Sequence, residues 1–257
     1  MLDAAVRAAA KAAELIDLNQ HRGAHPRLGA LDVLPFVPLG ETTMEDCIRL
    51  AHRAGHRIWN ELRIPVYFYQ AAALRPDRVQ LEDVRRGQFE GLLDCAFRDP
   101  VKAPDIGGPA LHPTAGAVVV GARKFLIAYN INLKTADLAI AKSIAARIRS
   151  SGGGLPAVKA LGLPLSSRGL VQVSMNLTDF EQTPVHAVYA EVHRLAATFD
   201  VEIAESELIG LMPRQALEMA FAHLLKLRDF DSQRVVENRL DELLAADNLN
   251  SPETAKF

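Results

Sequence analysis

The order of strands and helices predicted for the second half of the chain is the strongest constraint on its fold. The spacing of its apolar residues predicts, in chain order, strand 124–133, helix 135–150, strand 156–163, strand 170–177, helix 184–199 and strand 201–211. This βαββαβ order is that of a ferredoxin-like unit, which interleaves split βαβ units in one sheet. We therefore expect an α+β subdomain with Thr135 and Thr183 as helix N-caps. Helices over 213–227 and 232–246 are expected to follow.

The first half predicts fewer elements of a similar kind. Its patterns indicate helix 2–18, strand 31–37, helix 43–62 opened by Thr42 and Thr43, strand 64–70 and strand 117–120. Pro35 indicates a sheet edge or a bulge in its strand, and 121–124 is predicted to be a turn. These elements match the later part of a second ferredoxin-like unit whose first strands would precede Met1. So small a sheet is expected to leave an apolar helix face uncovered.

The segment 21–32 concentrates titratable side chains where no helix can continue. Gly23 lacks a preferred backbone conformation, and Pro26 lacks the amide hydrogen that a helix needs. His21 and His25 lie on the resulting loop, and histidine changes charge near neutral pH. The ordinary interpretation of a loop histidine is a surface residue. The two histidines also fail as a metal-binding helical pair, because no glutamate follows the first and the helix is broken. We expect no metal.

The stretch 103–116 is dense in glycine and proline and predicts no regular structure. Segments of this length inside a compact chain are usually functional or disordered, and the apolar strands that follow argue against disorder. Glycine allows the backbone to approach a ligand closely, and proline fixes a loop in advance. The composition of this stretch therefore favours a ligand-binding loop.

Composition excludes several functional classes. The 257 residues carry a formal net charge of −2 with no basic stripe, which gives nucleic-acid or membrane-surface binding no electrostatic support. The sequence shows neither a signal peptide nor an apolar run long enough to span a bilayer, so we expect a cytoplasmic protein. Cys47 and Cys95 form no disulfide framework, and Cys47 is expected to be buried on a helix face.

The motif His21-Arg22-Gly23-Ala24-His25-Pro26-Arg27-Leu28-Gly29-Ala30-Leu31-Asp32-Val33-Leu34-Pro35-Phe36 resembles that of the formiminotransferase family, the glutamate formimidoyltransferases of histidine degradation. The resemblance extends through 65–69, 103–116, 121–133, 171–177 and 207–213. It implies two ferredoxin-like subdomains, an N-terminally incomplete one over 1–121 and another over 122–257, and a homodimer. It also implies transfer of a formimino group from N-formiminoglutamate to N5 of tetrahydrofolate, with release of glutamate.

Carried over residue by residue, the resemblance implies that His25 is the catalytic base and acid. An imidazole with a pKa near neutrality suits proton transfer between two amines. The folate-contacting loop then comprises Gly107, Gly108, Pro109, Ala110, Leu111, His112, Pro113, Thr114, Ala115 and Gly116. Arg27, Arg123 and Lys124 are candidates for binding substrate carboxylates, although a solvated turn explains the last two equally well. Asp32 either orients His25 or caps the strand that follows it.

Two alternatives stay open at this point. One is a folate-binding or structural relative that lost catalysis together with N-terminal strands. The other is a metal hydrolase using His21, His25 and Asp32, and it is the weakest of the three hypotheses because of the broken helix.

Overall fold

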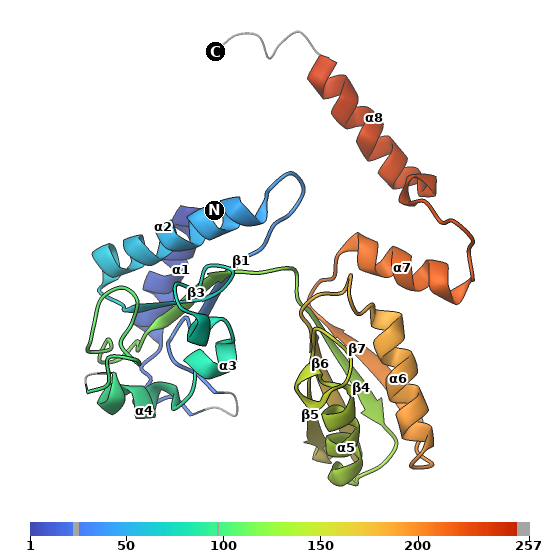
Figure 1. Ribbon diagram of the computed structural model, residues 1–257, viewed down its shortest axis with the longest axis horizontal. Helices are drawn as coiled ribbons and strands as arrows, with labels where there is room; N and C mark the ends of the chain where they lie inside the picture. Colours follow the sequence, from blue (N-terminus) through green and yellow to red (C-terminus); the bar gives the residue numbers. More distant parts are fainter. Residues whose placement is uncertain (23–25, 97, 251–257) are drawn as a thin grey trace. The chain divides into compact units, whose positions relative to one another are not determined.

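The computed structural model describes residues 1–22, 26–96 and 98–250 (Figure 1). Its contacts divide the chain into two compact units, Met1–Lys124 and Phe125–Phe257. The first unit contains a parallel three-stranded sheet and the second an antiparallel four-stranded sheet, each with helices. The expected α+β class with two subdomains is therefore confirmed.

The first sheet differs from the ferredoxin-like arrangement that the resemblance implied. Its strands lie in the order β1-β3-β2 and all pair in parallel. The bounds are β1 Val33–Phe36, β2 Val66–Gln70 and β3 Val118–Ala122. Parallel neighbours require long crossover connections, which helices usually supply. Here α2 (Met44–Leu62) connects β1 to β2, whereas the short helices α3 (Leu81–Val84) and α4 (Gln88–Cys95) lie between β2 and β3.

Helices cover both faces of this sheet. Helix α1 (Leu2–Leu15) and α2 pack on one face, and α3 and α4 pack on the other (Figure 1). On α1, Val6 and Ala9 are buried in the same core cluster as Ile58 of α2 and Phe68 of β2. The expectation of an uncovered helix face was wrong, because α1 and α2 share one apolar layer.

Local signals explain where α2 and β3 begin and end. The Thr43 side chain accepts a hydrogen bond from Asp46 N–H, and the Asp46 side chain accepts one from Thr43 N–H, which confirms the predicted helix start. Cys47 is buried, as predicted. The predicted turn over 121–124 was wrong at its start, because Gly121 still pairs with Tyr69 and Pro35 as part of β3. Pro35 indeed lies in an edge strand.

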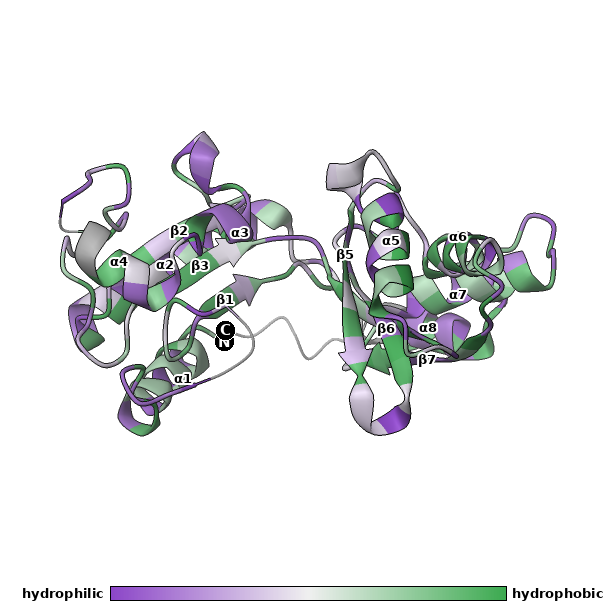
Figure 2. Ribbon diagram, turned by 90° about the horizontal axis from the view of Figure 1, so that it is seen from below, coloured by the Kyte–Doolittle hydropathy of each residue, from purple (hydrophilic) through white to green (hydrophobic). Residues whose placement is uncertain are grey.

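The second unit has the predicted βαββαβ order. Its elements are β4 Ile127–Leu133, α5 Leu138–Ile148, β5 Val158–Leu165, β6 Leu170–Leu177, α6 Val185–Ala197 and β7 Ile203–Ile209. The sheet order is β5-β6-β4-β7, and α5 and α6 lie along the same face (Figure 2). Helices α7 (Arg214–Leu224) and α8 (Val236–Asn250) follow, as expected.

Two predicted helix caps in this unit were wrong. The N-cap of α5 is Asp137, whose side chain accepts from Ala139 N–H, while the Thr135 hydroxyl only accepts from Asp137 N–H. The N-cap of α6 is Pro184, because the Thr183 hydroxyl donates instead to the carbonyl of Pro156 at 2.5 Å. For α5, the Asp137 side chain lies nearer the first free amide of the helix than Thr135 does. For α6, the Thr183 hydroxyl is already hydrogen-bonded to a carbonyl outside the helix.

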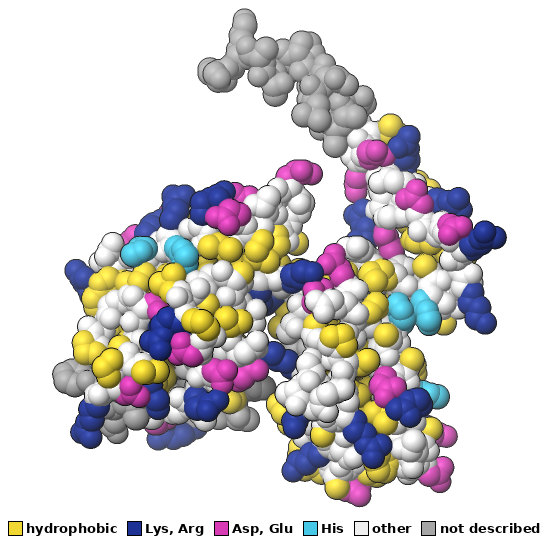
Figure 3. Space-filling view, viewed as in Figure 1, with side chains coloured by type: hydrophobic (Ala, Val, Ile, Leu, Met, Phe, Trp, Pro, Cys, Tyr) yellow, Lys and Arg dark blue, Asp and Glu magenta, His cyan; other side chains and the backbone are white. Residues whose placement is uncertain are grey.

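Acidic and basic side chains are interspersed on the visible surface of each unit (Figure 3). Among the helices of the described residues, none combines the length and the apolar character needed to cross a bilayer.

The outer edge of β2 is covered by the start of the glycine- and proline-rich stretch. Val66 exchanges backbone hydrogen bonds with Ile106, and the Asp105 carboxylate accepts from Phe68 N–H at 2.7 Å. Asp105 also forms an ion pair with Arg78 at 2.5 Å, and each side chain is 5% exposed. Arg78 in turn donates to the carbonyls of Val101 and Ala103. This buried pair therefore holds residues 101–106 against the sheet.

We expect Asp105→Asn to lower the free energy of unfolding by about 3–5 kcal/mol, because it leaves the Arg78 charge buried without its counter-ion. Urea denaturation measures the change. The control is Asp77→Asn, which removes an exposed pair with Arg75 and is expected to cost about 0–1 kcal/mol. Equal losses in the two variants would contradict this role of the buried pair.

Candidate functional site

Backbone hydrogen bonds join the two sequence motifs that carry the candidate site. Ala30 N–H donates to the Ala115 carbonyl at 3.0 Å, and Ala117 N–H donates to the Leu28 carbonyl at 3.2 Å. Upstream, Leu18 N–H donates to the Thr114 carbonyl at 2.9 Å. The loop predicted to contact folate thus lies directly beside the residues that flank 23–25. We call this contact the loop junction.

Glycines make the loop junction this close. A Cβ on Gly116 would lie 2.2 Å from the Leu28 carbonyl oxygen, and one on Gly29 would lie 1.7 Å from the Ala117 carbonyl oxygen. Gly116 also has a φ of +67°, in the left-handed region that favours glycine. No larger residue fits either position without moving the backbone.

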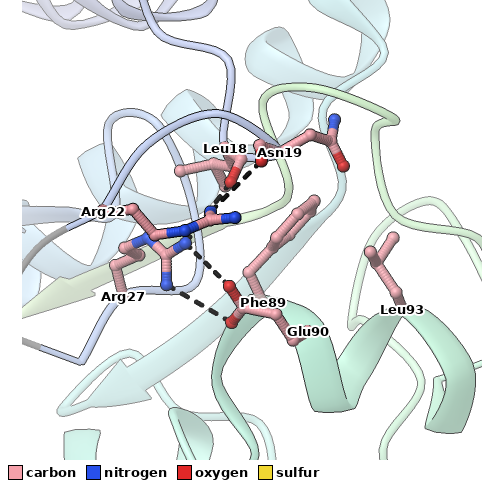
Figure 4. Close-up of a pocket in the computed structure, with 7 residues that line it drawn as sticks. All are labelled: Leu18, Asn19, Arg22, Arg27, Phe89, Glu90 and Leu93. Atoms are coloured by element: carbon pink, nitrogen blue, oxygen red, sulfur yellow. Dashed lines mark hydrogen bonds and ion pairs between the residues drawn. The ribbon is translucent and has the colours of Figure 1, made fainter.

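A cavity of about 540 Å³ opens next to the loop junction (Figure 4). Its walls combine apolar side chains from the core below α4 with polar and charged side chains at the rim. The lining residues are Leu18, Asn19, Arg22, Arg27, Phe89, Glu90 and Leu93. The cavity is therefore large enough for a small polar molecule and contains charges of both signs.

Arg27 is held in place by a carboxylate of the protein itself. Its guanidinium forms a two-point contact with Glu90, at 2.8 Å from Nη2 and 3.3 Å from Nη1, and also donates to the His21 carbonyl (Figure 4). These hydrogen bonds hold the pKa of Glu90 below its usual value. In this structure Arg27 therefore links the loop to α4, and its predicted contact with a substrate carboxylate stays a prediction.

Arg22 is the cation at this cavity that sequence reasoning left without a role. Its Nη1 donates to the carbonyls of Asn19 and His21, at 3.2 and 3.1 Å. Its charge adds to that of Arg27 in lowering the pKa of Glu90, although within the described part of the chain no carboxylate lies within ion-pair distance of it. Its position in the same loop as His25 is the signal that would have identified it.

The predicted folate loop has an exposed part and a buried part. Gly108, Pro109 and Ala110 are exposed, while Leu111 and Ala115 belong to the core. Between them, Nδ1 of His112 accepts from Ala115 N–H at 3.0 Å, and burial lowers the pKa of this imidazole. A neutral His112 therefore carries its hydrogen on Nε2 and presents a donor there.

Two other predicted residues, Asp32 and Arg123, interact with neighbours in the first unit: Asp32 with Arg85, and Arg123 with Tyr69. Asp32 accepts from Leu28 N–H at 2.7 Å and forms an ion pair with Arg85. Burial raises the pKa of Tyr69, and the nearby charges of Arg123 and Arg85 oppose that shift. Asp32 thus supports the turn into β1, and its predicted contact with His25 stays a prediction.

Some predicted residues have no described site geometry. Gly23, Ala24 and His25 lie outside the described residues. Lys124 is exposed at the end of the first unit. In residues 1–22, 26–96 and 98–250, no group of three or more His, Cys, Asp or Glu side chains is arranged to hold a metal ion.

The sequence is similar to known proteins over nearly its whole length. The formiminotransferase domain, N-terminal subdomain, matches residues 1–123, and the formiminotransferase domain matches residues 128–247. The first match starts at residue 1, and the strands expected to precede Met1 stay a prediction.

Curated relatives support the same likeness. The glutamate formimidoyltransferase of Thermoplasma acidophilum is 46% identical over 94% of this chain and 80% of the relative. That of Streptococcus pyogenes serotype M1 is 41% identical over 93% and 80%. The formimidoyltransferase-cyclodeaminase of Sus scrofa is 41% identical over 93% of this chain but only 46% of its own length.

We expect Gly116→Ala to destabilise the protein by about 1–3 kcal/mol more than Gly40→Ala, the usual range for overpacking. Both glycines have positive φ values, +67° and +55°, but a Cβ on Gly40 meets nothing within 4 Å. The comparison by thermal or urea unfolding therefore separates crowding at the loop junction from backbone strain. Equal decreases in the free energy of unfolding of the two variants would show that crowding at the loop junction does not contribute to the cost of the substitution.

Proposed function

The chain belongs to the formiminotransferase family, and from that premise we propose that it transfers the formimino group of N-formiminoglutamate to N5 of tetrahydrofolate. The chain is a transferase, a glutamate formimidoyltransferase that acts in histidine degradation. Tetrahydrofolate is its co-substrate. The identity of the catalytic residue and the contacts to each substrate are the parts that we propose.

One observation carries the proposal in this chain. The loop junction aligns 112–117 with 28–30 through backbone hydrogen bonds, although the two segments are far apart in sequence. A folate-contacting loop and a catalytic histidine loop must be neighbours if the acceptor is to meet a proton carrier. The hydrogen bonds on either side of 23–25 support the proposal on this ground.

In the proposed mechanism His25 moves protons between the two amines. N5 of tetrahydrofolate attacks the formimino carbon and a new N5–C bond forms, which gives a tetrahedral intermediate. His25 accepts the proton that N5 loses, and then donates a proton to the glutamate nitrogen as its bond to carbon breaks. Glutamate leaves, and the C=N bond is restored on 5-formiminotetrahydrofolate. A group with a pKa near neutrality is suited to both steps.

We expect His25→Ala to lower kcat by about 10²–10⁴-fold, the usual contribution of a general acid–base group, with little change in the melting temperature. Glutamate release from formiminoglutamate in the presence of tetrahydrofolate measures the reaction. The matched control is His21→Ala, an exposed imidazole in the same loop, which is expected to retain activity.

An active His25→Ala enzyme would contradict the assigned role. Folate binding by the unaltered protein without any glutamate release would instead support the alternative, a relative that binds folate but has lost catalysis. Homodimer formation also stays a prediction, and sedimentation of the same preparation measures it.

Arg22 is the cation that we propose for a carboxylate of formiminoglutamate. Arg27 beside it is hydrogen-bonded to Glu90, whereas Arg22 donates to backbone carbonyls at the cavity rim (Figure 4). A guanidinium binds a carboxylate through two parallel hydrogen bonds, and a hydrogen bond to a charged group contributes about 1.5–3 kcal/mol. Arg123 and Lys124 remain predictions for the same task.

We expect Arg22→Gln to raise KM for formiminoglutamate about 10- to 100-fold, the equivalent of one charge-assisted hydrogen bond, while KM for tetrahydrofolate changes little. Steady-state kinetics with each substrate varied in turn measures this. Arg53→Gln, on the exposed side of α2, is the control and should leave both constants unchanged. An unaltered KM for formiminoglutamate would rule out this contact.

A further inference from the structure

Helix α7 packs on the second unit through a stripe of residues that ends in a histidine. Met212, just before the helix, and Ala216 and Met219 in its first half pack on the core of this unit. His223 in the last turn continues the same stripe, because residues three or four apart share one face of a helix. Helices α6 and α7 are neighbours (Figure 1). Apolar contacts therefore hold the first half of α7, and a titratable ring stands at its end.

The ring of His223 stacks on the ring of His186 in α6. Their centroids are 4.2 Å apart and their planes differ by 15°. His186 is partly buried, and its Nδ1 is buried with no hydrogen-bond partner among the described residues. Neither ring has a role in the proposed mechanism. We call His186 and His223 the histidine pair.

This geometry disfavours a positive charge on the histidine pair. A protonated imidazole donates from both nitrogens, and the buried Nδ1 of His186 has no acceptor. Leaving such a donor unpaired in the interior is costly. A second imidazolium at the stacking distance would also repel the first. In agreement with this, burial and the charge of His223 lower the pKa of His186.

The carboxylates on the elements around the histidine pair are already engaged. Glu218 of α7 accepts from Ser232 and Asn238, and Glu191 of α6 pairs with Arg194. Asp179 and Glu181, in the segment before α6, also take part in other interactions. The other titratable or charged side chains on α5, α6, α7 and β4 are Lys142, Arg147, Tyr129, Tyr189, His193 and Arg214. None of them is a carboxylate that would stabilise an imidazolium.

We propose that the histidine pair is a pH-sensitive clasp, which holds the end of α7 on α6 while both rings are neutral and releases it when they are protonated. Release moves each ring into water, where both nitrogens of an imidazolium find acceptors. The first half of α7 then keeps only its apolar contacts at Ala216 and Met219. A leucine or phenylalanine at position 223 would continue the stripe and hold α7 equally at every pH.

The direction of the pH effect follows from the protons that each state binds. In the closed state the pKa of His186 lies below its ordinary value, so the open state binds more protons. Acid therefore favours opening, by up to about 10-fold per pH unit for each proton taken up. Because a free imidazole titrates near pH 6.5, roughly, the clasp is closed at pH 7.5 and weakened at pH 5.5.

The test compares His223→Phe with His193→Phe in the full chain. Phenylalanine at 223 keeps a flat ring for His186 and cannot be protonated. His193 is the matched control, because it is an exposed imidazole of α6 whose ring lies 6.2 Å from that of Tyr189 and not on a second histidine. Hydrogen exchange followed by mass spectrometry gives protection factors for the amides of α7 and β4. Protection factors remove the effect of pH on the intrinsic exchange rate.

We expect the protection of α7 to fall at least about 3-fold from pH 7.5 to 5.5 in the unaltered protein and in His193→Phe, as linkage requires when opening takes up protons. In His223→Phe the protection of α7 should be the same at both pH values. The amides of β4, at the centre of the sheet, should keep their protection in all three proteins, because the clasp opens locally.

His186→Phe removes the other ring of the clasp and should abolish the pH response of α7 as well. It also decides the question if His223→Phe does not fold. A response that survives in either folded variant would overturn the clasp. So would constant protection of α7 in the unaltered protein, or an equal loss in β4, which would indicate general acid unfolding.

Discussion

The close backbone contact between residues 28–30 and 115–117 is the constraint on which the candidate site depends. Hydrogen bonds at 3.0 and 3.2 Å place the two segments side by side, and glycine at positions 29 and 116 is what allows this spacing. Without that contact the glycine- and proline-rich loop would have no fixed relation to the histidine loop. Buried β3 continues directly from it, so the sheet holds the contact in position.

Three ion pairs hold the segments around this contact in place. Arg78 with Asp105 anchors the start of the loop, Arg85 with Asp32 anchors the turn into β1, and Arg27 with Glu90 attaches the histidine loop to α4. Each arginine in these pairs has an acidic partner within the protein. Arg22 differs, because in the described residues its guanidinium donates to carbonyl groups. Arg22 is therefore the cation that we propose for a substrate carboxylate.

Apolar patterns predicted most of the elements, because the helices bury one apolar face and the strands β2 and β3 are continuous apolar runs that bury both. The order of the second unit and the capping box at Thr43 are local properties of the chain. The parallel pairing of β1, β3 and β2 is not local. It depends on which strands the crossover connections bring together. The apolar residues of the short helices α3 and α4 repeat too weakly to predict this pairing. The caps at Asp137 and Pro184 failed for a related reason, since tertiary partners such as the Pro156 carbonyl compete for the hydroxyl.

The site was less predictable than the fold because it depends on pairing between distant side chains. A motif can indicate that Arg27 is a candidate binding residue. The sequence does not reveal that its guanidinium is hydrogen-bonded to Glu90. In the same way, the sequence does not reveal that Asn132, Gln172 and Glu207 lie on three adjacent strands, where the register brings their side chains into hydrogen-bond contact.

The two units present their polar side chains differently, and this follows from their sheets. The parallel sheet is covered on both faces, so its chemistry lies on loops that carry arginines. The antiparallel sheet is covered by helices on one face, so its other face carries polar side chains, here with carboxylates held by amides.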